Sequence, residues 1–382
     1  MLITADAVAT GWKLLRPGWI EVSANGTVAA LGEGTAPGPG GVDLGAVTVV
    51  PGFVDTHVHG GGGASFADGG AEGGPADTAT AVRFHRRYGT TTLVASLVSA
   101  GPDEMLRGVA ELADEARAGL IAGVHLEGPW LAVKRCGAHD PAVLRDPDPE
   151  EVARLLKAGG GTVRMVTVAP ERDGALAAIE RIVDAGAVAA VGHTEATYDQ
   201  THAAISAGVT VGTHLFNAMR PIHHREPGPI IALVEDPRVT VELIADGVHV
   251  LPPLYRHISD SVGPKRVTLV TDAMAAAGMA DGAYRLGPLA VDVRGGVAHV
   301  AGSQTIAGGT ATMDQLFRFA VTHCGLAGDE ALLLAVRQTS INPARALGLP
   351  GHGLVVGADA DLVALDADLK VARVLHRGRW VT

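Results

Sequence analysis

The chain has 382 residues, of which 47% are hydrophobic, and it carries a formal net charge of −11 at pH 7. This length exceeds one ordinary domain and suits a large α/β barrel of roughly 250 residues or more with a small additional domain. The acidic balance argues against binding to nucleic acid or to anionic membranes, because both require a basic face.

The two ends of the chain predict short strands and turns. Residues 19–34 carry an Asn-Gly pair between two β-prone runs, which is a strong hairpin signal. The tail from residue 357 to residue 382 alternates apolar and polar residues in the same way. We therefore expect a small β-sandwich domain built from residues 1–50 and 345–382, and a central catalytic domain of residues 51–344.

Apolar, β-prone runs alternate with helical patterns through the central part. The runs are 46–59, 90–99, 121–128, 162–170, 187–194, 209–216, 238–249 and 266–273. Glycine follows several helical patterns as a helix stop, and only the gap between the sixth and seventh runs is loop-like. This alternation predicts a closed parallel (β/α)8 barrel of the TIM type, with an open doubly wound sheet as the alternative. No GxGxxG follows a strand, so no dinucleotide cofactor is expected.

Cysteine usage and hydropathy indicate the compartment. The two cysteines, Cys136 and Cys324, form no CxxC, which excludes a disulfide framework and fits a reducing environment. The N-terminus lacks a basic segment before an apolar core, and no run of about 18 apolar residues occurs. We therefore expect a soluble cytoplasmic protein.

Titratable side chains stand at the carboxyl ends of six of the eight runs. They are His57 and His59 (first run), Glu127 (third), His193 (fifth), His214 (sixth), Asp246 and His249 (seventh) and Asp272 (eighth). In a barrel these ends meet at one mouth, where the active sites of this fold lie. A single strand histidine is more often a packed core residue, but this joint placement favours a site for one or two divalent metals.

The first run continues into four glycines. His57 and His59 share one face of their strand, because alternate strand residues point the same way. We interpret the bare backbone of Gly60–Gly63 as room beside this pair for metal and substrate. His125 either orients a ligand or fills the barrel, and Cys136 is interpreted as a small buried filler rather than a nucleophile.

Eight motifs in chain order identify a resemblance. PGFVDTHVHG, HLEGPW, GAHDP, VGHTEA, GTHLFNAMRP, ADGVH, LVTDAM and VAGS resemble those of N-acetylglucosamine-6-phosphate deacetylases of the amidohydrolase superfamily. The resemblance covers nearly the whole chain. HLEGP, THLFNAM and DGVH in this order are more specific than the HxH pair of the superfamily alone.

The resemblance implies a metal held by Glu127, His193 and His214, with Asp272 as the catalytic carboxylate. No lysine ends a barrel strand, so Glu127 takes the bridging role that a carbamylated lysine has in other superfamily members. The pair His57 and His59 offers ligands for a second metal. Zinc is the expected ion, with iron, cobalt, manganese or cadmium as alternatives.

The implied reaction is hydrolysis of the acetamide of N-acetylglucosamine 6-phosphate to glucosamine 6-phosphate and acetate, a step of amino-sugar catabolism and cell-wall recycling. Asp272 moves the proton and His249 steadies the oxyanion or a sugar hydroxyl. The matching substrate-binding positions are Ala138, His139, Asn217, Ala218, Arg225, Asp246, His249, Val300, Ala301 and Gly302. Among these positions, the ones expected to bind the phosphate are Arg225, His139, Asn217 and the backbone of Ala218.

The resemblance also implies a homodimer, because an arginine or histidine at such a site can come from the neighbouring subunit. An amidohydrolase for another N-acyl substrate, such as N-acetylgalactosamine 6-phosphate, is the alternative. A barrel that has lost catalysis and serves as a binding scaffold is disfavoured, because the ligand set has no gap and the aspartate after the eighth run is present.

Overall fold

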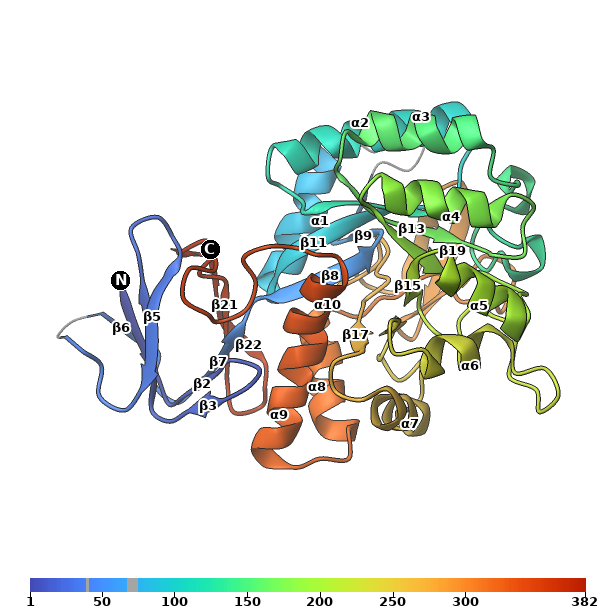
Figure 1. The fold of residues 1–382 in the computed structure, drawn as a ribbon. Helices are drawn as coiled ribbons and strands as arrows, with labels where there is room; N and C mark the ends of the chain where they lie inside the picture. Colours follow the sequence, from blue (N-terminus) through green and yellow to red (C-terminus); the bar gives the residue numbers. More distant parts are fainter. Residues whose placement is uncertain (39–40, 67–74) are drawn as a thin grey trace.

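The centre of the protein is a parallel sheet of eight strands. A computed structural model describes residues 1–38, 41–66 and 75–382 (Figure 1). The strands follow one another in space as they do along the chain: β8 (Phe53–Val58), β11 (Thr90–Leu97), β12 (Gly123–Glu127), β13 (Val163–Val168), β14 (Val188–Val191), β15 (Val209–Gly212), β16 (Thr240–Leu243) and β17 (Val267–Leu269). Beyond β17 the Asp272 amide donates to the His57 carbonyl at 2.9 Å, and Ala273 pairs in parallel with Val58. The sheet therefore closes into the predicted barrel.

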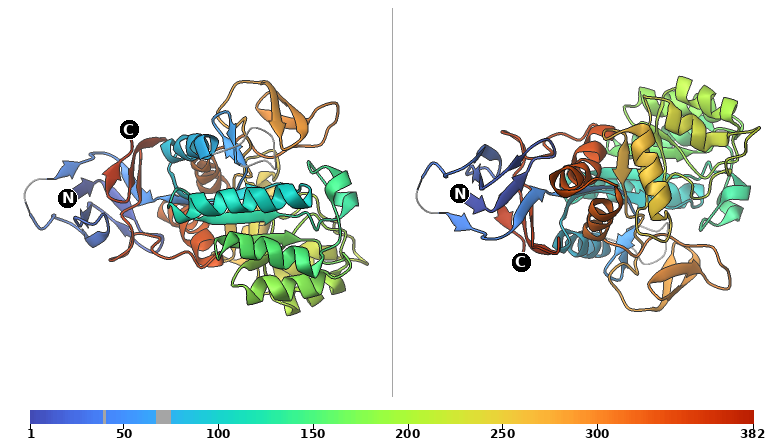
Figure 2. Two further views of the ribbon diagram at one scale, coloured as in Figure 1. Left: turned by 90° about the horizontal axis from the view of Figure 1, so that it is seen from above. Right: turned by 90° about the horizontal axis from the view of Figure 1, so that it is seen from below.

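Helices surround the barrel (Figure 2). They are α1 (Pro75–Arg87), α2 (Pro102–Arg117), α3 (Pro149–Gly159), α4 (Ala175–Asp184), α5 (Tyr198–Ser206), α6 (Gly228–Glu235), α7 (Pro252–Val262), α8 (Met313–His323), α9 (Gly328–Val336) and α10 (Asn342–Ala346). The predicted glycine stops are seen at α3, where Gly160 has a φ of 56°. Helix α6 occupies the gap that the sequence left loop-like. Within the described ranges, no helix has both the length and the apolar character that a membrane span requires.

Strands from both ends of the chain form a sandwich beside the barrel, at the left of Figure 1. One sheet has the order β5-β4-β1-β6 and the other β23-β22-β21-β7-β2-β3. Their bounds are β1 (Leu2–Ala5), β2 (Ala7–Ala9), β3 (Leu14–Leu15), β4 (Gly18–Val22), β5 (Val28–Glu33), β6 (Val42–Asp43), β7 (Thr48–Pro51), β21 (Leu362–Leu365), β22 (Val371–His376) and β23 (Arg379–Trp380). The two sheets share one apolar core that includes Ile20, Val49 and Leu362. The predicted hairpin is present, with β4 and β5 antiparallel and Gly26 at a φ of 81°.

The chain closes the bottom of the barrel before it returns to the sandwich. Leu347 and Leu349, which follow α10, pack with Val54 and Val94 of the barrel strands. The predicted boundary between residues 344 and 345 therefore falls inside α10, and this short segment belongs with the barrel core rather than with the sandwich.

A small antiparallel sheet is inserted between β17 and α8. It consists of β18 (Gly282–Leu286), β19 (Leu289–Arg294) and β20 (Val297–Val300), and it is drawn in orange in Figure 2. Val291 and Ala298 of this sheet pack against Met274, which follows β17. The sequence analysis assigned no strands to this region, and the insertion contributes one wall of the cavity described next.

Candidate active site

The side chains that the sequence predicts as metal ligands gather around Glu127, the last residue of β12. Its Oε1 lies 2.9 Å from Nε2 of His214 and 3.1 Å from Nε2 of His193. Its Oε2 lies 3.0 Å from Nε2 of His59. All four side chains are buried. One carboxylate thus stands between two groups of imidazoles.

The second group contains Asp272 together with His57 of β8 and His59, which directly follows that strand. The Nε2 atoms of His57 and His59 are 3.2 Å apart, and Oδ1 of Asp272 lies 3.4 and 3.2 Å from them. Ligand atoms around a tetrahedral zinc ion with bonds of about 2.0–2.1 Å are separated by about 3.3 Å. The spacing within each group therefore fits a divalent cation, and the Oε2 atom of Glu127 also has His139 Nε2 within 3.4 Å.

Strained backbone positions place three of these side chains. His193, His214 and Asp272 have φ values of 47°, 27° and 47°, and each lies just beyond a barrel strand. Residues other than glycine rarely adopt positive φ, and such positions cluster at functional sites because the surrounding structure has to hold them. Three of the strained positions among the described residues are thus two proposed metal ligands and the proposed catalytic aspartate.

Carbonyl groups orient two of the imidazoles. Nδ1 of His193 lies 2.8 Å from the Arg135 carbonyl, and Nδ1 of His59 lies 3.2 Å from the Ser96 carbonyl. Because a carbonyl only accepts hydrogen bonds, each Nδ1 carries a proton, and Nε2 is the ring atom that would bind an ion. Both ring nitrogens of His125 bond to hydroxyl groups instead, at 2.9 and 2.8 Å, so this histidine fills the barrel interior.

Burial and charge act against each other at the carboxylates. Burial alone raises the pKa of Asp272, but the charge of His57 and a hydrogen bond from His59 outweigh it and hold the pKa below its usual range. Burial likewise opposes ionisation of Glu127, and the surrounding histidines hold its pKa well below the ordinary value. The neighbouring imidazoles therefore hold both carboxylates in the anionic form.

His249 forms a separate pair with Asp246. Its Nδ1 donates to Oδ2 of Asp246 at 2.7 Å. Burial lowers the pKa of His249, but the carboxylate of Asp246 more than compensates, and the net pKa is raised. The imidazole on the cavity wall is therefore more readily protonated than a free histidine.

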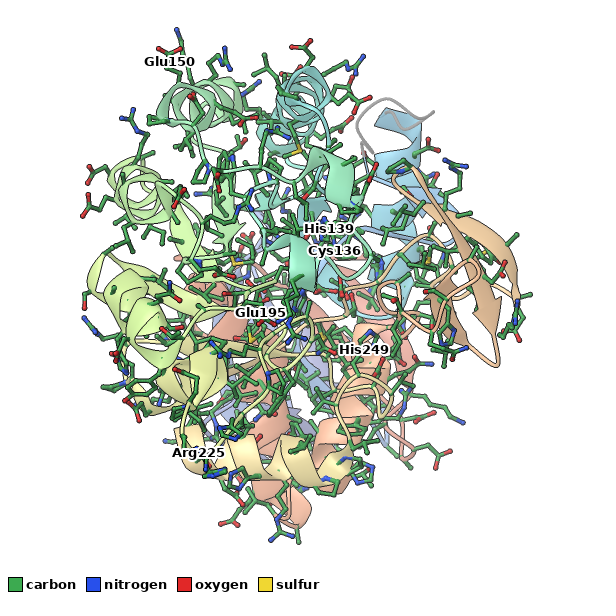
Figure 3. All side chains as sticks on the ribbon, turned by 90° about the vertical axis from the view of Figure 1, so that its right-hand side faces the viewer. Cys136, His139, Glu150, Glu195, Arg225 and His249 are labelled. Atoms are coloured by element: carbon green, nitrogen blue, oxygen red, sulfur yellow. The ribbon has the colours of Figure 1, made fainter. Side chains whose placement is uncertain are left out.

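A cavity of about 420 Å³ opens above these groups. Of the residues singled out from the sequence, its wall contains His59, Glu127, Ala138, His139, His193, His214, Asn217, Ala218, His249 and Asp272. Figure 3 shows Cys136, His139 and His249 together near the centre of this face. His57 lies just beneath the wall and is fully buried.

Five of the predicted substrate-binding positions do not line the cavity. Asp246 stands behind His249, and Arg225 is exposed, with its Nη1 2.8 Å from His224 Nε2. Arg225 lies far from the central group in Figure 3. Val300–Gly302 lead into a turn closed by the Ser303 amide donating to the Val300 carbonyl at 2.9 Å. The chain reaches the cavity only after this turn, so residues 304–306 form the wall in their place.

Two charged residues of the cavity wall were missed by the sequence reasoning. Lys134 and Arg135 line the wall, and both pair with Glu195, in the case of Lys134 at 3.0 Å. The available signal was the pair of adjacent cations between the HLEGPW and GAHDP motifs. These two side chains place positive charge on the wall of the cavity.

The interpretation of the four glycines is wrong. None of Gly60–Gly63 lines the cavity. A Cβ on Gly61 would lie 2.6 Å from Nε2 of His85 and 2.7 Å from Cδ1 of Phe84, both on α1. The absent side chains therefore allow α1 to pack closely against this segment, and they leave no space for metal or substrate.

Comparison with known proteins agrees with this geometry. Residues 48–381 match the model of the amidohydrolase family, and the chain belongs to that family. A structure of an aspartate-to-alanine variant of N-acetyl-D-glucosamine-6-phosphate deacetylase from Mycobacterium smegmatis, in complex with N-acetyl-D-glucosamine 6-phosphate, is 65% identical, with a TM-score of 0.98 over 100% of this chain and 99% of that chain.

Two curated relatives are more distant. N-acetylglucosamine-6-phosphate deacetylase of Danio rerio is 37% identical over 89% of this chain and 86% of its own length. N-acetylgalactosamine-6-phosphate deacetylase of Escherichia coli O157:H7 is 34% identical over 96% of both chains. The relatives thus share one reaction and differ in the C4 epimer that their names give.

Proposed function

We propose that this chain is a metal-dependent hydrolase that converts N-acetylglucosamine 6-phosphate into glucosamine 6-phosphate and acetate. The observation that carries the proposal is the ligand set centred on Glu127, with Asp272 beside it at the mouth of the barrel. The 65% identity to the M. smegmatis enzyme supports the same substrate.

The residues fit one or two divalent ions. Glu127, His193 and His214 would hold the first ion, and His57, His59 and Glu127 would hold the second. Zinc suits the nitrogen and oxygen donors, and iron, cobalt, manganese and cadmium are alternatives. When bound, such an ion lowers the pKa of a coordinated water towards 7 and polarises the amide carbonyl.

Asp272 and His249 supply the proton chemistry of the proposed reaction. The anionic Asp272 takes a proton from the attacking water and returns it to the nitrogen as the C–N bond breaks. The charged His249, held by Asp246, donates a hydrogen bond to the amide oxygen while negative charge develops there. Hydroxyl thus adds to the acyl carbon, hydrogen adds to nitrogen, and acetate leaves.

Binding of the phosphate requires cationic side chains or N–H hydrogen-bond donors on the cavity wall. Asn217 and Ala218 lie on this wall, and Lys134 and Arg135 add two cations to it. Arg225 is too far from the cavity of its own chain, so in this proposal it serves the cavity of a second subunit in a homodimer. The resemblance to the deacetylase family supports this arrangement.

Acetate release tests the proposal directly. The assay compares N-acetylglucosamine 6-phosphate, its C4 epimer N-acetylgalactosamine 6-phosphate, and both unphosphorylated sugars. We expect the highest kcat/KM on N-acetylglucosamine 6-phosphate. A preference for the galacto epimer would favour the activity named for the E. coli O157:H7 relative. Acetate release from none of the four sugars would favour the alternative of a non-catalytic binding scaffold.

A further inference from the structure

Glu242 is a buried glutamate in the middle of the apolar strand β16, and it is 2% exposed. Its Oε2 lies 3.4 Å from Nδ1 of His57 and 3.4 Å from the backbone nitrogen of His214. Its Oε1 accepts a hydrogen bond from the Thr56 hydroxyl at 3.1 Å. One carboxylate therefore reaches one ligand from each of the two metal groups.

The backbone of Glu242 holds the same turn as its side chain. The Glu242 carbonyl accepts a hydrogen bond from the Leu215 amide at 2.8 Å. Two successive amides after β15, those of His214 and Leu215, thus both donate to Glu242. His214 has a φ of 27°, a conformation that persists only where its surroundings hold it. Glu242 supplies these surroundings.

The side chain of Glu242 faces one imidazole, that of His57. Within the described residues, neither lysine nor arginine pairs with it, and its side-chain partners are Thr56, His57 and the His214 amide. A buried carboxylate is costly unless it is paired or bonded to several donors. A divalent ion just beyond His57 would supply the missing positive charge.

We propose that Glu242 is a positioning residue for both metal sites, and this inference rests on the proposed function. Its Oε2 accepts the Nδ1 proton of His57, so the Nε2 lone pair of His57 faces the ion. The same oxygen and the Glu242 carbonyl fix the turn that presents His214. Carboxylates in this outer position orient histidine ligands and increase their basicity.

The test is Glu242→Gln, studied as the full chain after removal of metal by a chelator. Titration with Zn²⁺ against a chromophoric chelator gives stoichiometry and affinity. We expect zinc affinity to fall about 10–100-fold at both positions, the range typical of such outer partners. Glu151→Gln is the matched control, because Glu151 is also buried but pairs with Arg145 outside the cavity, and its zinc affinity should equal that of the wild type.

Three outcomes decide the inference. Wild-type zinc affinity in Glu242→Gln overturns it, and a loss at only one of the two ions overturns the shared role. Nitrogen-15 spectra of the histidines should also show His57 losing its Nδ1–H form in this variant but not in Glu151→Gln. If Glu242→Gln does not fold, Thr56→Val releases the other carboxylate oxygen and should weaken zinc binding to a smaller degree, and unchanged binding overturns the inference.

The proposed function can be disproved without disproving the role of Glu242. Wild-type protein that binds zinc but releases no acetate would remove the proposed reaction. It would leave the zinc titration of Glu242→Gln as a valid measurement of positioning.

Discussion

Asp272 has its Oδ1 within 3.4 Å of Nε2 of both His57 and His59, as the proposed roles in metal contact and proton transfer require. Asp272→Asn keeps an oxygen near the histidines but removes the base. We expect kcat to fall by the roughly 10²–10⁴-fold typical of general acid–base catalysis, with most of the metal retained. Steady-state rates and metal analysis of the same sample check both statements, and near-native turnover would contradict the assignment.

The contact between His249 and Asp246 leads to a prediction about how activity depends on pH. The pKa of His249 is raised, so the ring keeps its proton to higher pH than a free histidine does and loses it as the pH rises through that pKa. Activity should therefore fall on the alkaline side. In Asp246→Asn the partner that raises the pKa is gone while burial remains, so this fall should move to lower pH.

The measurement is the pH profile of kcat/KM for the wild type, Asp246→Asn and His249→Gln. His249→Gln should lower the rate and lose this alkaline limb altogether. An alkaline limb that stays in place in Asp246→Asn would assign it to another group.

The end of strand β8 leads to a prediction about metal stoichiometry. If His57 and His59 hold the second ion, the native protein should bind more than one divalent ion per chain at saturation. The double change His57→Gln and His59→Asn should reduce this number to one, with the ion at Glu127, His193 and His214 retained. Inductively coupled plasma mass spectrometry gives both numbers. Saturation of the native protein at one ion, retained in the variant, would make the pair a polar lining of the mouth.

In the segment after β8, a substitution should lower the folding free energy without changing metal binding. Gly61→Ala forces a methyl group against Phe84 and His85 of α1, and overpacking of this kind costs about 1–3 kcal/mol of folding free energy. Metal content should stay at the wild-type value. Gly38→Ala is the control, because a Cβ there meets nothing within 4 Å. Denaturant unfolding and metal analysis distinguish this result from the discarded interpretation, which requires a loss of metal.

The sequence predicts the elements whose signal is local. Nearly continuous apolar runs define the barrel strands, and glycine marks helix ends such as that of α3, so these elements are seen where expected. The convergence of His57, Glu127 and His214 follows from the fold, since parallel strands end at one mouth. Strands β18–β20 were not expected, because they form a separate sheet outside the alternation of strands and helices that predicts the barrel.

Contacts between distant segments carry no such local signal. Glu242 appears in the sequence as one charged residue inside an apolar strand, and only the closed barrel brings it to His57. Arg225 and residues 300–302 were assigned to the cavity from motif order, but loop geometry decides whether such residues reach it. Sequence motifs thus identify the chemistry of the site better than its walls.

The proposed role of Arg225 depends on the assembly of two subunits. In a homodimer that shares this residue across its interface, Arg225→Ala should raise KM for N-acetylglucosamine 6-phosphate roughly 10–150-fold, the loss of one charge-assisted contact of about 1.5–3 kcal/mol. The unphosphorylated sugar should be unaffected. Arg154→Ala, at an exposed arginine on α3, is the control for the loss of charge.

A mixed dimer separates contact across the interface from contact within one chain. One subunit carries Arg225→Ala and the other carries Asp272→Asn. The only site with an intact Asp272 then receives its arginine from the second subunit, so KM should be close to the wild-type value. A raised KM in the mixed dimer would place the contact within one chain, and equal losses on both substrates would make Arg225 a structural residue.

The shared sheet of the sandwich also determines the order in which the protein can be completed during synthesis. Strand β21 pairs with β7, with Leu362 opposite Pro51, so this sheet joins strands synthesised before the barrel to a strand synthesised after it. The barrel strands follow one another along the chain and can associate as they emerge. The N-terminal strands of that sheet have to wait, with an unpaired edge, until β21 is made. A ribosome stalled before residue 362 should therefore carry a chain whose N-terminal segment is still open to protease.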